Sequence, residues 1–477
     1  MRAHSNRIFA LAIAALLMFG TASAFGQGGA GGAGGGAGGG TGTDGATPQA
    51  GGVEIDASGV LKRRMVIANS DGLSRHRWQQ AQVSLNKEIQ KVSELRKVSL
   101  VKLEREVARL KAEGKSISDD IRYLAGLTQI THVFFYPEEN DIVIAGPAEG
   151  YFLNGRHRVV GMNSGKATLH LEDLVVALRA FGPDGKRASL ISCSIDPTQE
   201  GLQRFQQAYR QVAANYRGTH QARQVAETFY NAMGLQTISF KGVSSETRYA
   251  QVMAEADYRM KLYGIGVEQA PVRISTFIEM ATPATGGAGK LQRWFFQPNY
   301  ECVKVNKEGN AMALEGSGVK LVCEDESVSS NGKRARKKGR ANGASRKFAA
   351  SFTKNYEKIA ARATVFDELS NLIDMSIVAA FIQKKDLYRQ ANWDMATFGD
   401  EDKYAVEVYP APEKVAPVIN SVVKQGALMT PIGGGVHIQP RAALNSDKVT
   451  VDADGAIGTV RDTIKFGNLA EGQWWWD

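Results

Sequence analysis

Hydrophobic positions recur along this chain at two different spacings, which predict helices and strands in alternation. Between residues 74 and 110, apolar side chains return at every third or fourth position, at Leu85, Ile89, Val92, Leu103, Val107 and Leu110. This period predicts a helical face, with a break near residues 98–100 that divides it into two helices. Residues 131–136 and 141–145 are apolar runs on either side of a proline-containing turn, so they predict a β-hairpin.

The two patterns continue through the rest of the chain. They predict strands at residues 189–195, 237–241, 272–278 and 294–323, and helices that begin near Pro197, Gln221 and Ser245. Residues 365–382 form a nearly apolar helix, but Asp367, Glu368 and Asp374 within it predict burial in protein rather than in lipid. This alternation predicts an α+β fold, in which mixed β-sheets are flanked by helices.

The first 24 residues have the pattern of a secretory signal peptide. Arg2 and Arg7 precede an apolar run at residues 8–19, and small residues follow up to Ala24. A core of about a dozen apolar residues is shorter than the ~20 that cross a bilayer, so we expect cleavage after Ala24 and no transmembrane helix afterwards. The separated arginines favour the general secretory pathway. The sequence therefore predicts a periplasmic, cell-surface or extracellular protein.

Composition and pattern together divide the remaining chain. Residues 25–52 are dominated by glycine and predict a disordered tether, because such a segment cannot bury enough apolar surface to offset chain entropy. The patterns then predict an N-terminal α+β domain at residues 53–182, a central α/β domain at 183–326, a basic disordered loop at 327–347 and a C-terminal helical and β region at 348–477.

The basic loop carries the strongest chemical signal. Of the formal net charge of +9, the signal peptide holds +2 and residues 333–347 hold +8, which leaves −1 for the rest. The cations are Lys333, Arg334, Arg336, Lys337, Lys338, Arg340, Arg346 and Lys347. Their field favours an anionic envelope polymer or an acidic glycan, although a tolerated insertion without a partner is the alternative. Interleaved aromatic residues are missing, so specific nucleic-acid binding is not expected.

Other candidate residues have a structural interpretation beside the functional one. Asp196 ends a predicted strand, where α/β enzymes place catalytic carboxylates, but residues 196–199 also fit a helix N-cap with a capping box. Arg259 and Lys261 could bind a ligand, or could pair with the acids four positions before them. The tryptophans at 474–476 could stack on sugars, but docking into the fold is favoured because exposed indoles promote aggregation.

Three short motifs have closer structural explanations. Ser351 and Lys354 have the spacing of penicillin-binding enzymes, but the other parts of that signature are missing. The glycines at 433–435 precede a predicted strand, so a turn is favoured over a phosphate cradle at a helix N-terminus. Residues 452–455 are similar to part of a calcium loop, but Arg461 stands where a bidentate glutamate is needed, so a hairpin turn is favoured.

The three cysteines exclude a fold built on a disulfide framework. A bridge between Cys302 and Cys323 stays open, although the predicted meander separates them by two strands, or ~9.5 Å, against a limit of ~7 Å. The histidines and cysteines have no metal-ligand spacing, so we expect neither a metal site nor a cofactor.

Several stretches together resemble a family of exported planctomycete proteins that is catalogued as domain of unknown function 1598. They are residues 127–130, 136–137, 145–150, 254–261, 371–374 and 428–436. The resemblance extends from about residue 95 to 454, and the glycine tract and basic loop are local additions. It implies export and a role in the envelope, and it supplies no catalytic residues.

Two hypotheses about function follow. The first is a structural or binding role at the cell envelope, in which the glycine tract gives reach and the basic loop contacts anionic polymers. The alternative is an extracytoplasmic hydrolase that acts on glycan or peptide, with carboxylates that converge only in three dimensions. The sequence decides neither whether the protein is an enzyme nor its oligomeric state.

Overall fold

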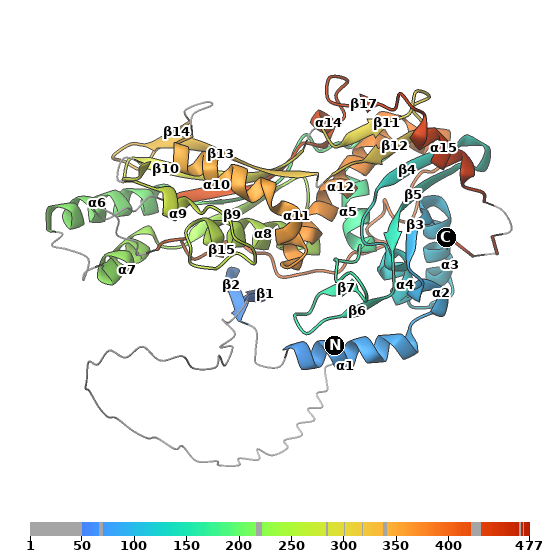
Figure 1. Cartoon of the computed structure of the whole chain (residues 1–477), viewed down its shortest axis with the longest axis horizontal. Coiled ribbons are helices and arrows are strands. Elements are labelled where there is room, and N and C mark those ends of the chain that lie inside the picture. Colours follow the sequence, from blue (N-terminus) through green and yellow to red (C-terminus); the bar gives the residue numbers. More distant parts are fainter. Residues whose placement is uncertain are drawn as a thin grey trace, which may run out of the picture. The chain divides into compact units, whose positions relative to one another are not determined.

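Strands from widely separated parts of the sequence pair into two β-sheets (Figure 1). The computed structural model describes residues 50–65, 70–215, 222–282, 285–299, 301–316, 318–336, 341–420, 431–466, 469–470 and 472–477. The predicted signal peptide and almost all of the predicted tether lie outside the described residues.

The larger sheet has nine described strands. From one edge to the other they are β1 (Ala50–Ile55), β2 (Val60–Met65), β15 (Lys414–Val415), β9 (Gln236–Lys241), β8 (Ile191–Asp196), β16 (Ile432–Ile438), β10 (Lys290–Pro298), β13 (Val319–Val328) and β14 (Arg334–Arg336). β2 and β15 are parallel, as are β16 and β10, and the other neighbours are antiparallel. The sheet is therefore mixed.

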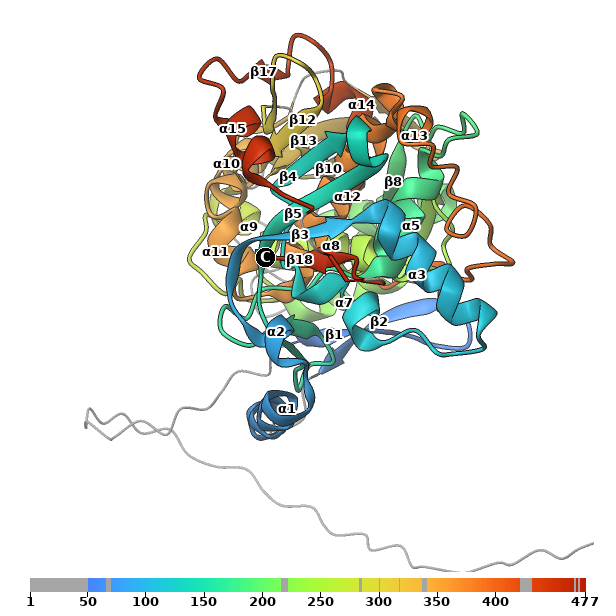
Figure 2. The ribbon, with the colours of Figure 1, turned by 90° about the vertical axis from the view of Figure 1, so that its right-hand side faces the viewer.

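The second sheet has seven described strands. In spatial order they are β17 (Thr450–Val451), β11 (Val303–Val305), β12 (Ala311–Leu314), β4 (His132–Tyr136), β5 (Asp141–Ala148), β3 (Ser93–Ser99) and β18 (Trp475–Trp476). Figure 2 shows β4, β5, β3 and β18 in succession. The predicted hairpin is confirmed as β4 and β5, and a small separate hairpin consists of β6 (Tyr151–Leu153) and β7 (Val159–Gly161).

Helices cover both sheets. They are α1 (Ser70–Ser84), α2 (Lys87–Gln90), α3 (Leu100–Ala112), α4 (Asp119–Arg122), α5 (Leu171–Ala180), α6 (Gln199–Asn215), α7 (Ala222–Met233), α8 (Arg248–Gly264), α9 (Phe277–Met280), α10 (Gly343–Lys354), α11 (Tyr356–Ala360), α12 (Thr364–Lys384), α13 (Leu387–Gln390), α14 (Pro440–Ala443) and α15 (Ala456–Thr463). Single 3-10 turns occupy Leu124–Gly126 and Pro137–Glu139. The predicted α+β class is confirmed.

Two helices lie at the centre of the main core. α8 packs against β8, β16 and β10 on one side, and against α12 and α5 on the other. α12 is buried along most of its 21 residues, because its apolar side chains point in every direction around the helix. The predicted burial of this helix in protein is confirmed. Among the described residues, we find no helix with both the length and the apolar character that crossing a membrane requires.

The predicted domain boundaries at residues 182 and 326 do not separate compact units. Residues 48–477 form one unit, and a single apolar core includes side chains from both sheets and from α5, α8 and α12. The larger sheet takes strands from all three predicted regions, and β16 lies between β8 and β10. The local hydrophobic pattern could not predict this shared sheet, because it does not indicate which strands, far apart in the sequence, pair with each other.

Some predicted elements were wrong. Residues 93–99, predicted as part of a helix, form β3 between β5 and β18, so pairing in the sheet outweighs the helical period. Residues 272–278, predicted as a strand, form a loop and the start of α9, whose capping box pairs Thr276 with Glu279. The glycines at 433–435 lie inside β16 and not in a turn.

The segment predicted as a basic disordered loop is also ordered where the structure describes it. β13 continues to Val328, β14 pairs with β13, and α10 begins at Gly343. Near the C-terminal end, Asp454 and Gly455 precede α15 instead of forming a hairpin turn, and Asp452 accepts a hydrogen bond from the Ile457 N–H at 2.7 Å. Residues 337–340 lie outside the described part of the chain.

The terminal tryptophans dock into the fold, as favoured from the sequence. β18 pairs with β3, and Trp474 and Trp476 are buried. Next to them the wholly buried Arg96 donates to Asp477 at 2.8 Å. Cys193, Cys302 and Cys323 are all free thiols, so the open question of a bridge is answered against it.

Candidate functional site

The structure describes five of the eight predicted anion-binding residues. Lys333 is exposed, but the Arg334 guanidinium is partly buried and donates to Glu326 at 2.6 Å. Arg336 lies in β14, whereas Lys337, Lys338 and Arg340 lie outside the described residues. Arg346 and Lys347 are exposed on α10. Binding of an anionic polymer by this segment stays a prediction, but Arg334 has a structural partner.

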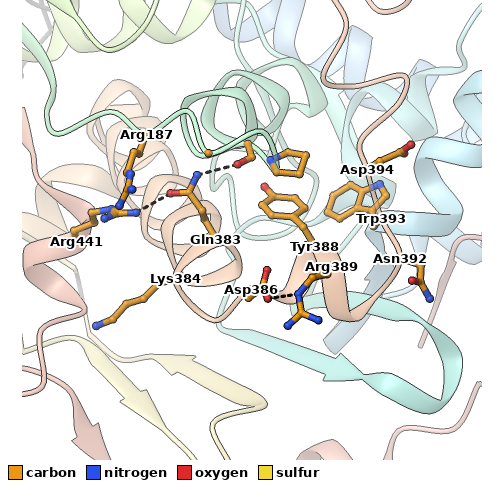
Figure 3. Close-up of a pocket in the computed structure, with 13 residues that line it drawn as sticks. Arg187, Gln383, Lys384, Asp386, Tyr388, Arg389, Asn392, Trp393, Asp394 and Arg441 are labelled. Atoms are coloured by element: carbon orange, nitrogen blue, oxygen red, sulfur yellow. Dashed lines mark hydrogen bonds and ion pairs between the residues drawn. The ribbon is translucent and has the colours of Figure 1, made fainter.

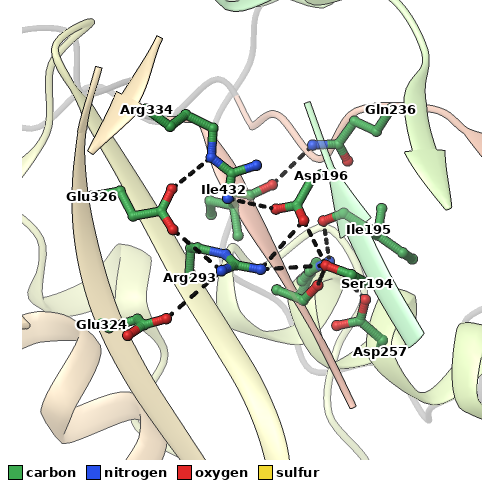
Figure 4. Close-up of polar contacts among 12 residues, drawn as sticks. Ser194, Ile195, Asp196, Gln236, Asp257, Arg293, Glu324, Glu326, Arg334 and Ile432 are labelled. Carbon is green, nitrogen blue, oxygen red and sulfur yellow. Dashed lines mark hydrogen bonds and ion pairs between the residues drawn. The ribbon is translucent and has the colours of Figure 1, made fainter. Parts of the chain in front are cut away.

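Arg334 belongs to a cluster of charges at the end of β8 (Figure 4). Its guanidinium lies 3.2 Å from Asp196, and the nearly buried Arg293 lies 3.3 Å from the other oxygen of the same carboxylate. Arg293 also contacts Glu326 at 3.2 Å. Burial alone would raise the pKa of Asp196, but the two guanidinium groups lower it.

Asp196 is therefore not the N-cap that residues 196–199 favoured. α6 begins at Gln199, and the Thr198 hydroxyl accepts the Gly201 N–H at 2.9 Å. A carboxylate held ionised by two arginines is also poorly suited to donate a proton, so the arrangement favours a structural role over a catalytic one.

Glycines in β16 make room for this cluster. A Cβ atom at Gly433 would lie 2.7 Å from an Asp196 carboxylate oxygen, and one at Gly434 would lie 1.7 Å from the Trp294 carbonyl oxygen. Gly434 also has φ +148°, a conformation that L side chains rarely adopt. The glycine run thus allows Arg293 on β10 to reach across β16 to Asp196 on β8.

α8 carries charges on two opposite faces. Arg248, Glu255 and Arg259 are seven and then four positions apart, which returns to one face because a turn has about 3.6 residues. Asp257 and Lys261 lie on the opposite face, where they form a wholly buried pair at 2.8 Å. Lys261 also donates to the Ile195 carbonyl at 3.2 Å. The predicted pairings four positions apart are thus confirmed, and a ligand-binding role for the buried Lys261 is disfavoured.

The Arg248 face of α8 belongs to a chain of alternating charges. In order, its members are Asp173, Arg248, Glu368, Arg158, Glu255, Arg259, Glu268 and Arg63. Arg248 lies 2.6 Å from Glu368, and Arg259 lies 2.7 Å from Glu268. Because each inner member faces an opposite charge on both sides, this network is electrically balanced.

A different electrostatic arrangement occurs in a cleft of 740 Å³ after α12 (Figure 3). Its walls come from the loop at residues 182–187, the segment at 383–394, and Arg441 on α14. Arg187, Lys384 and Arg441 line it, and among the described residues none of these three has an ion-pair partner. Figure 3 shows them at one end of the cleft, with Trp393 and Asp394 at the other. We call this the cationic cleft.

The wall after α12 turns sharply at residues with a left-handed backbone. Asp386 has φ 56°, Asn392 has φ 49° and Met395 has φ 53°. Asp and Asn adopt this conformation more readily than most residues, whereas at Met395 it is strained. Arg389 donates to Asp386 at 2.6 Å, which closes the first of these turns.

A buried carboxylate fixes this strained segment to the rest of the fold. Glu104 on α3 accepts hydrogen bonds from the Trp393 indole and from the N–H groups of Thr397 and Phe398, the latter two at 2.7 and 2.6 Å. Hydrogen bonds to an ionised acceptor are among the stronger ones in proteins. These hydrogen bonds attach the wall of the cationic cleft to α3, which suits a preformed binding site.

Gln383 connects the other walls of the cleft. Its amide nitrogen donates to the carbonyl oxygens of Gly182 at 2.8 Å and Lys186 at 2.6 Å, and its amide oxygen accepts from Arg441 at 2.8 Å. Two polar atoms in the lining keep unused hydrogen-bonding capacity. The Tyr388 hydroxyl and the Arg441 Nε are shielded from solvent and have no partner among the described residues.

No pattern in the sequence predicts this site. Arg187, Lys384 and Arg441 are single cations far apart in the chain, and none belongs to the basic run. The other sequence candidates stay outside the cleft, and the Ser351 hydroxyl accepts the Ser275 N–H at 2.9 Å. In the part of the chain that is described, no group of three or more His, Cys, Asp or Glu side chains could hold a metal ion.

Comparison with known families adds one finding. Residues 193–277 match the model of a family described as a protein of unknown function, DUF1598. The resemblance that the sequence suggested is thereby confirmed in this segment. The DUF1598 segment contains most of β8 and all of α6, α7, β9 and α8, and hence Asp196 and both charged faces of α8. The cationic cleft lies outside it. No curated protein and no solved structure matches the chain.

Proposed function

We propose that this chain is an exported binding protein whose cationic cleft holds an anionic group of an envelope polymer or an acidic glycan. The observation that carries the proposal is the set of three cations, Arg187, Lys384 and Arg441, that line one cleft without a carboxylate partner among the described residues. Like charges gathered in a concave site repel each other and concentrate anions, so a bound anion relieves the repulsion.

The lining also offers donors for such an anion. Two of the three cations are arginines, Arg187 and Arg441, and an arginine fork matches the geometry of carboxylate, phosphate and sulfate groups. The hydrogen bonds from the wall to Glu104 support a preformed site, and a preformed site lowers the entropy cost of binding.

The N-terminal pattern of the sequence supports the exported part of the proposal. Arg2 and Arg7, the apolar run and Ala24 favour delivery to a compartment where anionic glycans and envelope polymers occur. The exposed cations Lys333, Arg346 and Lys347 could add weaker, salt-sensitive contacts to the same polymer.

The hydrolase alternative receives less support from the cleft. Its carboxylates, Asp386 and Asp394, are exposed, and Asp386 is paired with Arg389 at 2.6 Å. A glycosidase needs one protonated and one ionised carboxyl group facing each other across the bond that breaks. The arrangement favours binding over acid–base catalysis.

The test removes two cleft cations and measures anion binding. We expect the double variant Arg187→Gln/Lys384→Gln to bind trigalacturonate, inorganic sulfate and inorganic phosphate at least about tenfold more weakly than the wild type, because each lost charge-assisted hydrogen bond contributes about 1.5–3 kcal/mol. Isothermal titration with each of the three anions measures this, and their ranking distinguishes a carboxylated from a sulfated or phosphorylated ligand.

A matched control has the same net charge. Lys385→Gln/Lys403→Gln removes two exposed cations that do not line the cleft, of which Lys403 is already paired with Asp400. It should keep wild-type affinity. Equal weakening by both double variants would mean that only overall charge matters, and unchanged binding by the cleft variant would refute the proposal.

A further inference from the structure

Among the described residues, six charged side chains line the cationic cleft, namely Arg187, Lys384, Asp386, Arg389, Asp394 and Arg441. Asp386 and Arg389 pair with each other at 2.6 Å, so together they add no net charge to the site. The three cations of the proposed anion site lie at one end of the cleft, and Asp394 lies at the other (Figure 3). The charge that remains is therefore positive at one end and negative at the other.

The charge of Asp394 is not compensated. Its Oδ1 atom accepts the Ala396 N–H at 3.0 Å, and the side chain is exposed. The cations nearest to it in sequence each pair with another aspartate, Arg389 at 2.6 Å and Lys403 at 3.5 Å, and in the described part of the chain no other cation pairs with Asp394. Asp394 is thus available to a positively charged group of a ligand.

The two ends of the cleft are attached to different parts of the fold. Next to Asp394, the Asn392 amide donates to Asn140, in the turn between β4 and β5, at 2.9 Å. At the other end, Gln383 connects Arg441 to the loop at residues 182–187. Because separate elements hold the two ends, we expect the site to favour ligands of one length. Its volume of 740 Å³ is within the ~300–1,000 Å³ of ordinary ligand sites.

We propose that the cationic cleft binds a short zwitterionic peptide, with a carboxylate at the cation end and an ammonium group at Asp394. This inference rests on the proposed function, and it names the class of ligand that carries the anionic group. A ligand with both charges meets an opposite charge at each end of the cleft, whereas further negative charge next to Asp394 is unfavourable.

A peptide matches the separation of these charges better than a charged sugar does. Each extended residue adds ~3.3–3.6 Å, so a few residues place the two terminal charges of a peptide far apart. An amino sugar acid carries both charges on one ring, whereas the Asp386–Arg389 pair lies between the charged ends of the cleft (Figure 3). The arrangement therefore favours a peptide chain, such as a peptide branch of an envelope polymer.

The test compares alanine peptides of about two to five residues, each with free termini, with an acetylated N-terminus or with an amidated C-terminus. Titration calorimetry at low ionic strength measures their binding to residues 25–477. At the best length, the free peptide should bind about three- to tenfold more tightly than the N-acetyl form, which is the effect of one partly exposed charge pair. The amidated form lacks the carboxylate and should also bind more weakly than the free peptide.

A substitution at Asp394 isolates the negative end of the cleft. Asp394→Asn keeps the oxygen that accepts the Ala396 N–H but removes the charge, so the variant should bind the free and N-acetyl peptides with similar affinity. Asp402→Asn is the matched control, because Asp402 is exposed and does not line the cleft. It should keep the preference of the wild type for the free peptide.

The proposal is wrong if the wild type binds neither peptide form, binds both equally at every length, or if Asp394→Asn keeps the preference. Tighter binding of 2-amino-2-deoxyglucuronate than of any peptide would overturn the assignment to a peptide. Sulfate, phosphate and trigalacturonate test the cation end. If their binding depends on Arg187 and Lys384 while free peptides have no advantage, the proposed function holds and only this inference fails.

Discussion

At the scale of single residues, the buried carboxylates differ in whether a positively charged side chain lies next to them. Asp196 lies between two arginines, which lower its pKa against the effect of burial. Asp367 on α12 accepts the Ala167 N–H at 2.7 Å but has no ion-pair partner among the described residues, and burial raises its pKa to about 6. The same residue type is thus held ionised at one position and disfavoured as an ion at the other.

This contrast predicts a pH-dependent effect of Asp367→Asn. A folded pKa of about 6, raised from 3.8, means that the proton-linked stability is fully present below pH 3.8 and is lost as the pH rises through 6. Near pH 7 the wild type therefore carries the cost of a buried ion, of about 2–3 kcal/mol. Asparagine cannot ionise, so the variant should be more stable than the wild type near pH 7, and the difference should vanish near pH 4.

Urea unfolding across this pH range measures the effect, and Asp394→Asn serves as the control. Asp394 is exposed, so its replacement should change the free energy of unfolding by less than about 0.5 kcal/mol at every pH. A destabilisation by Asp367→Asn that is the same at all pH values would instead mean that the hydrogen bond to Ala167 dominates.

At the scale of elements, β14 shows how a basic segment can be part of a sheet. Its Arg334 donates to Glu326 on β13 at 2.6 Å and lies 3.2 Å from Asp196 on β8. We expect Arg334→Gln to lower the free energy of unfolding by about 1–3 kcal/mol, because it leaves a buried carboxylate with one partner fewer. Chemical denaturation with a fluorescence readout measures the loss.

Lys333→Gln is the control for this effect, since Lys333 is exposed one position before β14. It should leave stability within about 0.5 kcal/mol of the wild type. If Arg334→Gln also left the free energy of unfolding unchanged, the ion pairs of β14 would not contribute to stability. The segment would then behave as the disordered loop that its composition predicts.

Elements with a strong internal pattern could be predicted from the sequence. α12 and α8, the β4–β5 hairpin and the docking of the terminal tryptophans are all marked by apolar runs or local charge spacing. β3 could not be predicted, because the residues on either side of it have the hydrophobic spacing of a helix. It is a strand because it pairs with β5 and β18. The glycines of β16 are explained only by Trp294 and Asp196, which are distant in sequence.

The candidate sites were less predictable than the elements. Arg187, Lys384 and Arg441 become one site only because Gln383 joins the loop at 182–187 to α14. A sequence shows residue types, whereas uncompensated charge and unused hydrogen-bonding capacity depend on three-dimensional neighbours.

At the scale of the whole molecule, chain order and spatial order differ in the larger sheet. β16 comes more than a hundred residues after β10, yet it lies between β8 and β10 and pairs with both. The DUF1598 segment contributes β8 and β9 to this sheet, and α8 packs against β8, β16 and β10 together. The central region is therefore incomplete without the C-terminal part of the chain.

This topology predicts that the fragment 183–326 does not fold alone. Without β16, both β8 and β10 lose a ladder partner, and α8 loses part of the surface that buries its apolar side chains. The wholly buried Asp257–Lys261 pair would then be exposed to water on one side. We expect little amide dispersion in NMR spectra of this fragment, whereas the fragment 48–477 should show native dispersion. A folded fragment 183–326 with native-like dispersion would mean that β8 and β10 reach a stable arrangement without β16, and the central region would then be an independent domain after all.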